Sequence, residues 1–379
     1  MSVRATRARK EPASDALIID GVLDVDEVAE VIPYTYAITA YGADYPVDLL
    51  VRRLKEGDIF IPLFSLSTAT ADSPVRFQRE YVWKKLQADR FIESLLLGLP
   101  VPGIFLVKEE SGKHLVLDGH QRLQTLYWFY ANNWEGGAFS LEAVQDRFKD
   151  RTYQQLEAAD RRRLNDSVVH ATIIRQDEPS EDLSSIYLIF ERLNSGGTSL
   201  HPQEIRVALY HGRFVQLLSS LNVHASWRAL FGRKSKRLKD IELILRFFAL
   251  LESSKKYAPP MKGFLSSYMA HRRNLDPSLE AEFRSFFEQT SDAILRAIGP
   301  KAFKPKGTLN AAVVDAVMVG VARRITAKGG APDPTSLKAA YNLLLRDESF
   351  QAAISRATAN EENVKQRLKL ATSLISGAE

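Results

Sequence analysis

The sequence has no cysteine among its 379 residues. Disulfide bonds, thiolate metal sites and cysteine nucleophiles are therefore excluded. The chain also lacks the Gly-x-x-x-x-Gly-Lys-Ser/Thr loop that holds phosphates in many nucleotide-binding proteins. Any nucleotide site in this chain must be of a different type. The lack of cysteine fits a cytoplasmic protein, which is the location we expect.

Long hydrophobic runs are missing too. The N-terminal stretch MSVRATRARKEPASD is basic and no long apolar stretch follows it, so we expect residues 1–22 to be a disordered basic tail and not a signal peptide. The most apolar later stretch, residues 310–325, is too short to cross a bilayer and has Asp315 at its middle. It predicts a buried helix, and we expect no membrane partner.

Neither sign of charge strongly dominates, with 51 Lys and Arg against 46 Asp and Glu and a pI near 9.1. This modest basic excess permits a polyanionic partner without requiring one. The densest basic stretch, FGRKSKRLKD at residues 231–240, holds five Lys and Arg in ten residues. It is either a solvated loop or a contact with DNA phosphates. The candidate DNA-binding residues are Arg233, Lys234, Lys236 and Arg237.

Two regions of the chain differ in their hydrophobic patterns. In residues 24–222, strand-like runs such as DIFIPLF, GIFLVKE, KHLVLD and SVVHATIIR alternate with helical patterns. From residue 237 onward strand signals disappear, and helices are expected at residues 240–252, 260–272, 278–298, 310–327 and 336–345. We therefore predict an α+β chain with a basic tail at 1–22, a mixed-sheet domain at 23–230 and an all-helical domain at 231–379.

The stretch LVLDGHQRLQTLYW, residues 115–128, joins a strand to a helix through five polar or glycine residues. Apolar residues recur downstream at helical spacing, so the helix should begin at or beside Gly119. A helix N-terminus carries unpaired N–H groups and a positive dipole end, which can hold a phosphate. Arg122 would add a charge-assisted clamp. This joint is the first candidate site.

Each residue of the joint also has a plain structural role open to it. Asp118 either holds a divalent cation or orients a water, or it caps the helix. His120 either moves a proton near neutral pH or points to solvent. Arg122 either binds phosphate or pairs with a surface acid. The joint alone does not decide between these roles.

Two further stretches add candidates. VRFQREYVW, residues 75–83, places Gln78 and Arg79 before an aromatic pair and leads into a predicted helix. IFERLNSGGTSLHPQEI, residues 189–205, ends one helix at a glycine pair and begins the next at Pro202, with His201 in the capping position. The turn itself requires neither Arg192 nor Asn194, so both are candidates for binding.

Four stretches in this order, FQREYVW, IESLLLGLPVPGIFL, LDGHQRLQTL and FERLNSGGTSLHPQEI, resemble the N-terminal domain of GmrSD modification-dependent restriction endonucleases. That family is described as ParB/sulfiredoxin-like, with a central Asp-Gly-Gln-Gln-Arg motif. The resemblance is strong over residues 47–210 and weak over residues 236–252. It implies a ParB/sulfiredoxin-like mixed sheet and nucleotide chemistry in prokaryotic defence against foreign DNA.

Carried over by position, the resemblance assigns a phosphate and metal site. It comprises Asp118, Gly119, Gln121 and Arg122, with Gln78 and Arg79 facing it. The implied cofactors are a nucleoside triphosphate and Mg²⁺ or Mn²⁺, with Asp118 as the metal ligand. His120 departs from the family, which usually has glutamine there, and His201 replaces the usual asparagine.

Two absences limit what the resemblance carries over. Sulfiredoxin chemistry requires a cysteine, so only the fold and nucleotide binding transfer. Because no histidine lies beyond His271, the His-Asn-His nuclease domain of many relatives is missing. We expect residues 237–379 to cleave nothing and to pack, dock a partner or position DNA.

The leading functional prediction is a protein that binds and hydrolyses a nucleoside triphosphate and acts on DNA in restriction or antiphage defence. In it Arg122 and the helix N-terminus hold phosphates, Asp118 holds Mg²⁺ or activates water, and Arg79 offsets transition-state charge. A separately encoded nuclease or defence subunit would be a further partner. The alternatives are direct DNA cleavage by the same residues and a non-catalytic DNA sensor or clamp switched by nucleotide. All three predict that Asp118 and the Arg79 loop meet in one cleft.

Overall fold

The computed structural model describes residues 17–19, 21–24, 37–61, 63–64, 77–78, 81–178, 183–193 and 200–377. The chain divides into two compact units. The sheet unit comprises residues 34–211, and the helical unit comprises residues 1–33 and 212–379. These limits differ from the expected boundaries after residues 22 and 230.

Two local features account for the difference in boundaries. Leu17–Ile19 forms strand β1 within the segment expected to be a tail, and it pairs with β2, Val22–Asp24. Helices α7 (Arg213–Leu221) and α8 (Ala225–Phe231) were expected in the mixed-sheet domain. They belong to the helical unit, where the buried Trp227 ring of α8 lies 5.6 Å from the ring of Phe287.

The described residues of the sheet unit contain a five-stranded mixed sheet in the order β3-β9-β7-β8-β4. These strands are β3 (Ala37–Pro46), β4 (Ile59–Phe60), β7 (Ile104–Lys108), β8 (His114–Asp118) and β9 (Val168–Glu178). Strand β7 runs parallel to β9 and antiparallel to β8, with Phe105 opposite Asp118. The start of β7 and the end of β8 therefore meet at one end of the sheet. A separate pair joins β5 (Leu63–Phe64) to β6 (Phe77–Gln78).

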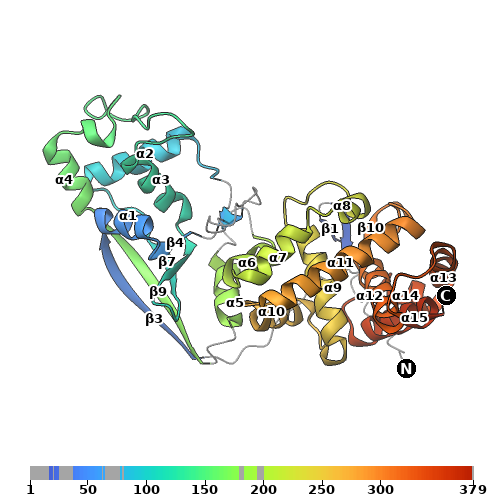
Figure 1. Ribbon diagram of the computed structural model, residues 1–379. Coiled ribbons are helices and arrows are strands. Elements are labelled where there is room, and N and C mark those ends of the chain that lie inside the picture. The colour runs from blue at the N-terminus through green and yellow to red at the C-terminus, as the bar shows by residue number, and fades with distance from the viewer. Residues whose placement is uncertain are drawn as a thin grey trace, which may run out of the picture. The chain divides into compact units, whose positions relative to one another are not determined.

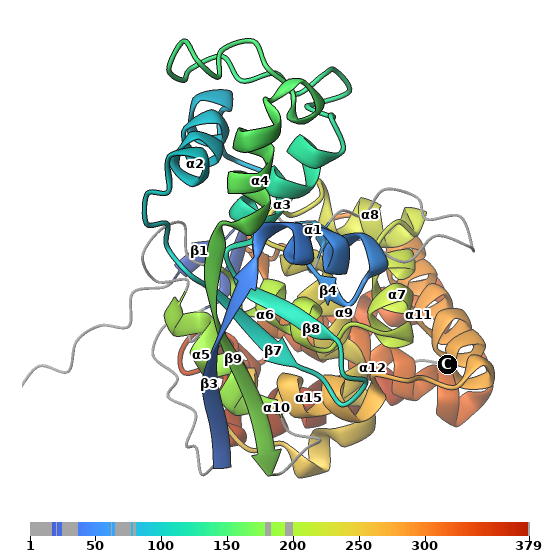
Figure 2. The same ribbon diagram turned by 90° about the vertical axis from the view of Figure 1, so that its left-hand side faces the viewer.

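Helices gather at that same end of the sheet. They are α1 (Val47–Glu56), α2 (Lys85–Leu97), α3 (His120–Tyr130) and α4 (Ala158–Asp166), with a 3-10 turn at Tyr153–Gln155. Figures 1 and 2 both show α1 to α4 clustered where β3 ends, and Figure 2 shows β8 in the same sheet. Two more helices, α5 (Ser184–Leu193) and α6 (Pro202–Leu209), complete the unit. The Ser185 hydroxyl of α5 donates to the Gln176 side chain of β9 at 3.0 Å.

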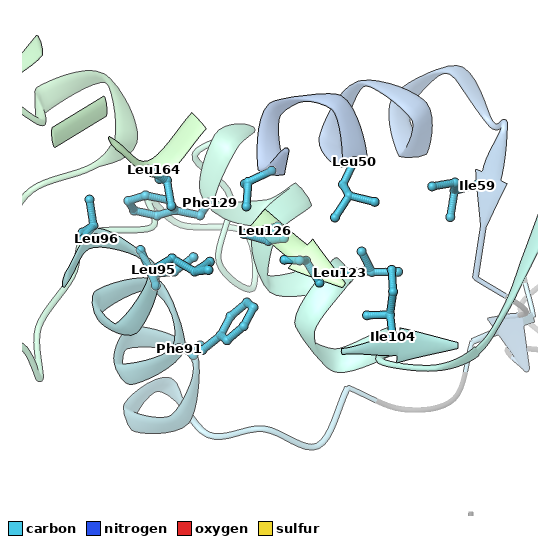
Figure 3. Close-up of a cluster of buried hydrophobic side chains, with 14 of the residues drawn as sticks. Leu50, Ile59, Phe91, Leu95, Leu96, Ile104, Leu123, Leu126, Phe129 and Leu164 are labelled. Carbon is cyan, nitrogen blue, oxygen red and sulfur yellow. The ribbon is translucent and has the colours of Figure 1, made fainter. Parts of the chain in front are cut away.

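The core of the sheet unit explains why these elements form. Leu123 and Leu126 of α3 meet Phe91 and Leu95 of α2 over Ile104 of β7 (Figure 3). All are buried, and a large apolar side chain that leaves water contributes about 1.5–3 kcal/mol. Five apolar residues at helical spacing along α2 are all buried and form the face that packs into this core: Ala88, Phe91, Ile92, Leu95 and Leu96.

The helical unit is built around a buried helix, α12 (Ala311–Lys328), which packs against α9, α11 and α15. The remaining elements are α9 (Lys239–Ser253), α10 (Met261–Arg272), α11 (Pro277–Ala297), α13 (Pro334–Arg346), α14 (Glu348–Ala353) and α15 (Glu361–Ser376), with a 3-10 turn at Ser254–Lys256. A short strand, β10 (Leu309–Asn310), pairs with β2. The prediction that residues 310–325 form a buried helix is confirmed.

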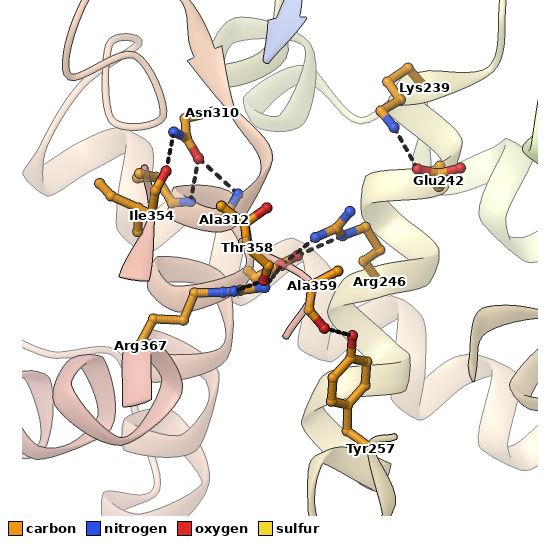
Figure 4. A network of polar contacts seen from close by, with 12 residues as sticks. Lys239, Glu242, Arg246, Tyr257, Asn310, Ala312, Ile354, Thr358, Ala359 and Arg367 are labelled. Atoms are coloured by element: carbon orange, nitrogen blue, oxygen red, sulfur yellow. Dashed lines mark hydrogen bonds and ion pairs between the residues drawn. The ribbon is translucent and has the colours of Figure 1, made fainter. Parts of the chain in front are cut away.

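Asp315 lies on α12 and is fully buried with two arginines. Arg246 donates to it through Nε at 3.0 Å and Nη2 at 2.7 Å, and Arg367 donates through Nη2 at 2.8 Å. Figure 4 shows the two guanidinium groups converging from different helices. The carboxylate therefore joins α9, α12 and α15 inside the unit.

The predicted fold class, an α+β chain with a helical C-terminal part, is confirmed. The predicted all-helical character has one small exception, because β10 contributes two residues to a sheet. Within the described residues, no helix combines the length and the apolar composition that a membrane crossing requires.

Candidate functional site

The turn between β8 and α3 accepts only glycine. Gly119 adopts φ 96°, in the left-handed region, and a Cβ built there would lie 2.4 Å from Cγ2 of Ile104. Its carbonyl accepts the first bond of the helix, from the Leu123 N–H at 2.9 Å. The prediction that α3 begins beside Gly119 is confirmed. The helix N-terminus therefore opens directly from the end of β8.

Arg122 is held across this turn. Its Nη2 donates to Oδ2 of Asp118 at 2.9 Å and to the Gly103 carbonyl at 2.9 Å, so it bridges the end of β8 and the start of β7. The Arg122 side chain is 15% exposed and that of Asp118 is 39% exposed. The Nε atom of Arg122 is buried and has no hydrogen-bond partner among the described residues. The guanidinium is thus fixed in place with part of its donor capacity unused.

Gln121 turns inward and binds the polypeptide itself. Its Oε1 accepts the backbone N–H groups of Val82 at 3.2 Å and of Trp83 at 3.3 Å. The residue is only 8% exposed. Gln121 therefore joins two of the stretches that the sequence singled out, residues 75–83 and 115–128.

This orientation of the Gln121 amide fixes the state of the neighbouring histidine. Because Oε1 faces two N–H donors, the nitrogen Nε2 must be the atom that lies 2.8 Å from Nε2 of His120. The amide nitrogen can only donate, so His120 accepts through an unprotonated Nε2. Protonation of that ring nitrogen would break the contact.

A second chain of hydrogen bonds ties the same two stretches together. The Thr125 hydroxyl donates to the Gln121 carbonyl at 2.7 Å and lies 2.7 Å from the Tyr81 hydroxyl, which is therefore the donor between them. Burial raises the pKa of Tyr81 to about 12, so its hydroxyl stays protonated near neutral pH. The Tyr81 ring also lies 4.4 Å from the ring of Trp128, so this segment is anchored by packing as well.

A family model described as the GmrSD restriction endonuclease N-terminal domain matches residues 63–211. The match supports the GmrSD N-terminal domain family for this part of the chain. The resemblance inferred from the sequence is therefore confirmed. No curated protein matches the sequence. The match ends at residue 211, where the sheet unit also ends. Elements β3, α1 and β4 come before the match. Residues 34–62 therefore add both edge strands to the sheet of the matched domain.

The predicted site residues of the GmrSD N-terminal domain fall into three groups. Asp118, Gly119, His120, Gln121 and Arg122 lie together at the β8–α3 turn. Gln78 contributes its backbone to β6, and Arg192 is exposed in the last turn of α5. The Gln78 side chain, Arg79 and Asn194 lie outside the described residues.

The prediction that Asp118 and the Arg79 loop meet can therefore be examined only through the described residues next to Arg79. Tyr81 and Val82, which follow shortly after Arg79 in the chain, contact Thr125 and Gln121 of α3. The two stretches lie side by side at that point. The position of the Arg79 side chain stays a prediction.

The metal prediction rests on Asp118 alone. Among the described residues, no three His, Asp or Glu side chains are placed to hold a metal ion together. Mg²⁺ in nucleotide sites is commonly held by one or two carboxylates together with phosphates. Asp118 therefore fits a cation that arrives with a nucleotide, and a metal site made by protein ligands alone does not fit these residues.

The predicted DNA-binding loop lies in the helical unit, between α8 and α9. Arg233, Lys234 and Lys236 are exposed, and Arg237 is partly buried. Trp83 and Trp128 of the sheet unit are packing residues, because both are partly buried against that unit's core.

Sequence reasoning missed two residues of this site: Gly103 and Tyr81. Gly103 and Tyr81 lie inside stretches that were singled out, LPVPGIFL and FQREYVW, so the signal was present. The local sequence does not report the pairing of β7 with β8, which brings the Gly103 carbonyl to Arg122.

Proposed function

We propose that this chain is a protein of prokaryotic restriction or antiphage defence that binds and hydrolyses a nucleoside triphosphate and acts on DNA. One observation carries the proposal: Arg122 is fixed at the N-terminus of α3 by Asp118 and the Gly103 carbonyl. Membership of residues 63–211 in a restriction endonuclease domain family supports the defence role. A cytoplasmic location is part of the same proposal.

The phosphates bind at the first turn of α3. Its N–H groups lack intrahelical acceptors, and the positive end of the helix dipole favours negative charge there. Both hydrogen bonds of Arg122 use Nη2, which leaves Nη1 for a phosphate oxygen. Gly119 adds no side chain of its own at this turn, where it lies buried beside the Ile104 and Arg122 side chains.

Asp118 and His120 supply the chemistry. Mg²⁺ bound to the phosphates would use Asp118 as its protein ligand, and it would supply charge neutralisation at the reacting phosphate. Asp118 also orients the attacking water, and the unprotonated Nε2 of His120 accepts a proton when Gln121 releases it. Gln78, Arg79, Arg192 and Asn194 complete the nucleotide site in this proposal, with Arg79 offsetting charge in the transition state.

Duplex DNA binds at the loop between α8 and α9, through Arg233, Lys234, Lys236 and Arg237. In this proposal a separately encoded nuclease or defence subunit is the partner that makes the cut, and residues 237–379, which have no histidine beyond His271, supply no His-Asn-His chemistry. The helical unit then positions DNA or a partner and does not cleave it.

The nucleotide-switched sensor is the second candidate. One observation favours it over direct cleavage: the Asp118 carboxylate is already paired with Arg122, which limits its capacity to act on a phosphodiester by itself. In this form the site binds a triphosphate without turning it over. Binding alone then changes the affinity for DNA.

Phosphate release separates these candidates. The purified full-length protein is incubated with each nucleoside triphosphate and Mg²⁺, with and without duplex DNA, and free phosphate is followed. Release above the rate of an Arg122→Ala variant supports hydrolysis, while triphosphate binding without release supports the sensor. Nicking of supercoiled plasmid by the protein alone would support the direct nuclease instead.

A further inference from the structure

The loop between α8 and α9 is held on a rigid internal frame. Oδ2 of the buried Asp240 accepts hydrogen bonds from Asn222 and Arg228, each at 3.0 Å, and from the Ser235 N–H at 3.2 Å. The Ser235 hydroxyl in turn accepts the N–H of Arg237 at 3.1 Å. The exposed cations of this loop therefore project from a fixed backbone.

A second basic loop of the helical unit lies against the first. Residues 301–306, between α11 and β10, carry Lys301, Lys304 and Lys306. The Lys304 ammonium donates to the Phe231 carbonyl at the end of α8 at 3.1 Å, and a Cβ on Gly232 would lie 3.8 Å from it. Residues 233–237 and 301–306 contain no Asp or Glu, so only cations come from these two loops.

The aromatic residues between the two loops face inward. Trp227 and Phe303 are fully buried, with ring centroids 6.3 Å apart, and Phe231 is 6% exposed. Proteins that bind single strands combine cationic grooves with exposed aromatic rings for base stacking. These aromatic residues offer no such platform. The combination of fixed cations and buried rings suits the phosphate backbone of a duplex, read without regard to sequence.

We propose that residues 233–237 and 301–306 form one surface that binds the phosphate backbone of duplex DNA. The proposed function supplies only the identity of the polyanion. The proposed surface gains three lysines from the second loop, and Lys304 joins the two loops. Removing one cation that binds a phosphate should reduce the slope of log K against log salt concentration by about one.

The test compares matched variants of the full-length protein by fluorescence anisotropy with a short labelled duplex over a salt titration. Lys301→Ala/Lys306→Ala should reduce the slope by about two and weaken binding several-fold at physiological salt. This double variant keeps the Lys304 hydrogen bond with α8, so the frame stays intact. Adding Lys304→Ala should reduce the slope further, with folding checked by thermal unfolding. The control is Lys328→Ala/Lys338→Ala/Lys369→Ala, which removes three exposed lysines from α12, α13 and α15.

Three outcomes would overturn the proposal. The first is a slope for Lys301→Ala/Lys306→Ala equal to that of the wild type, and the second is an equal loss in the control variant. The third is tighter binding of a single strand of the same length than of the duplex. Phosphate release without DNA is measured on the same variants and should be unchanged. A protein that releases no phosphate would therefore contradict the nucleotide proposal and leave the DNA result standing.

Discussion

Two polar residues of the β8–α3 turn have different roles, one open to a ligand and one bound to the polypeptide. Arg122 spans the sheet end and keeps donor capacity for a ligand, while Gln121 uses its carbonyl to bind the polypeptide. By helical spacing, Gln121, Arg122 and Thr125 fall on one side of α3. In the structure Gln121 and Thr125 are buried, because Tyr81 and Val82 cover that face.

Replacing Gln121 should therefore destabilise the sheet unit. Gln121→Ala leaves the N–H groups of Val82 and Trp83 without their acceptor, at a cost of about 1–3 kcal/mol in the free energy of unfolding. Faster hydrogen exchange at these two amides should accompany the loss. The matched control is Gln124→Ala on the same helix, a partly exposed position, which should cost less than about 0.5 kcal/mol. Equal effects of the two substitutions would show that Gln121 does not anchor residues 81–83.

The residues that form the site were predictable from the sequence, but the directions in which their side chains point were not. A strand that breaks into glycine and then a helical pattern is a local signal, so the start of α3 was found. The burial of Gln121 depends on a segment that lies about 40 positions away along the chain, which no local pattern reports. Pairing across that separation is decided by tertiary packing.

At the scale of elements, Gly119 links the strand to the helix by conformation and by contact. Gly119→Ala should destabilise the sheet unit through both the positive φ and the overlap with Ile104. Gly98, the C-cap of α2, is the matched control, since it has φ 74° and no atom within 4 Å of a built Cβ. Gly98→Ala should cost about 1–2 kcal/mol from φ alone, and Gly119→Ala about 1–3 kcal/mol more from overpacking. Urea unfolding measures both, and equal costs would contradict the packing argument.

Strand β8 also carries a buried histidine at its start. His114 is 6% exposed, and burial, helped by Arg53 and Lys108, lowers its pKa. The unfolded chain therefore takes up a proton below about pH 6.5 that the folded state resists, so stability is lost as the pH falls. The slope reaches at most about 1.4 kcal/mol per pH unit for this one group.

His114→Gln should remove this part of the pH dependence. Urea unfolding between about pH 7 and about pH 5 should then show a smaller loss of stability than in the wild type. His170→Gln, at a side chain 60% exposed in the same unit, provides the control. An unchanged acid dependence in His114→Gln would mean that other groups carry it.

The long helices of the helical unit were largely predictable, while some shorter or interrupted elements of both units were missed. The expected helices at 240–252, 260–272, 278–298, 310–327 and 336–345 all exist within a few residues of their predicted ends. Strand β3 was missed because Gly42, Asp44 and Pro46 interrupt its pattern. Its pairing with β9 over the full length supplies what the local sequence does not. Helices α14 and α15 were also missed, although apolar residues recur at helical spacing along α15 and form the buried stripe that packs against α12.

At the scale of the whole molecule, each unit has its own core, and the helical unit depends on the buried Asp315. Asp315→Ala would leave Arg246 and Arg367 buried without a counter-charge, at a cost of about 3–5 kcal/mol. Hydrogen exchange should show this loss in α9, α12 and α15. The control is Glu280→Ala, which removes a partly exposed ion pair with Arg284 in the same unit and should cost less than about 1 kcal/mol. A small effect of Asp315→Ala would mean that the network is not what joins these helices.

The central claim is that Asp118 and Arg122 serve the nucleotide more than the fold. The most direct measurement is triphosphate turnover and binding by Asp118→Ala and Arg122→Ala beside urea unfolding of the same proteins. The control is Arg90→Ala, an exposed arginine on α2. We predict that both site variants lose turnover, that Arg122→Ala binds triphosphate at least about tenfold more weakly, a loss of about 1.4 kcal/mol, and that each costs at most about 1–2 kcal/mol of stability. Full turnover in either variant, or unfolding of either under native conditions, would contradict the claim and leave these residues as structural parts of the turn.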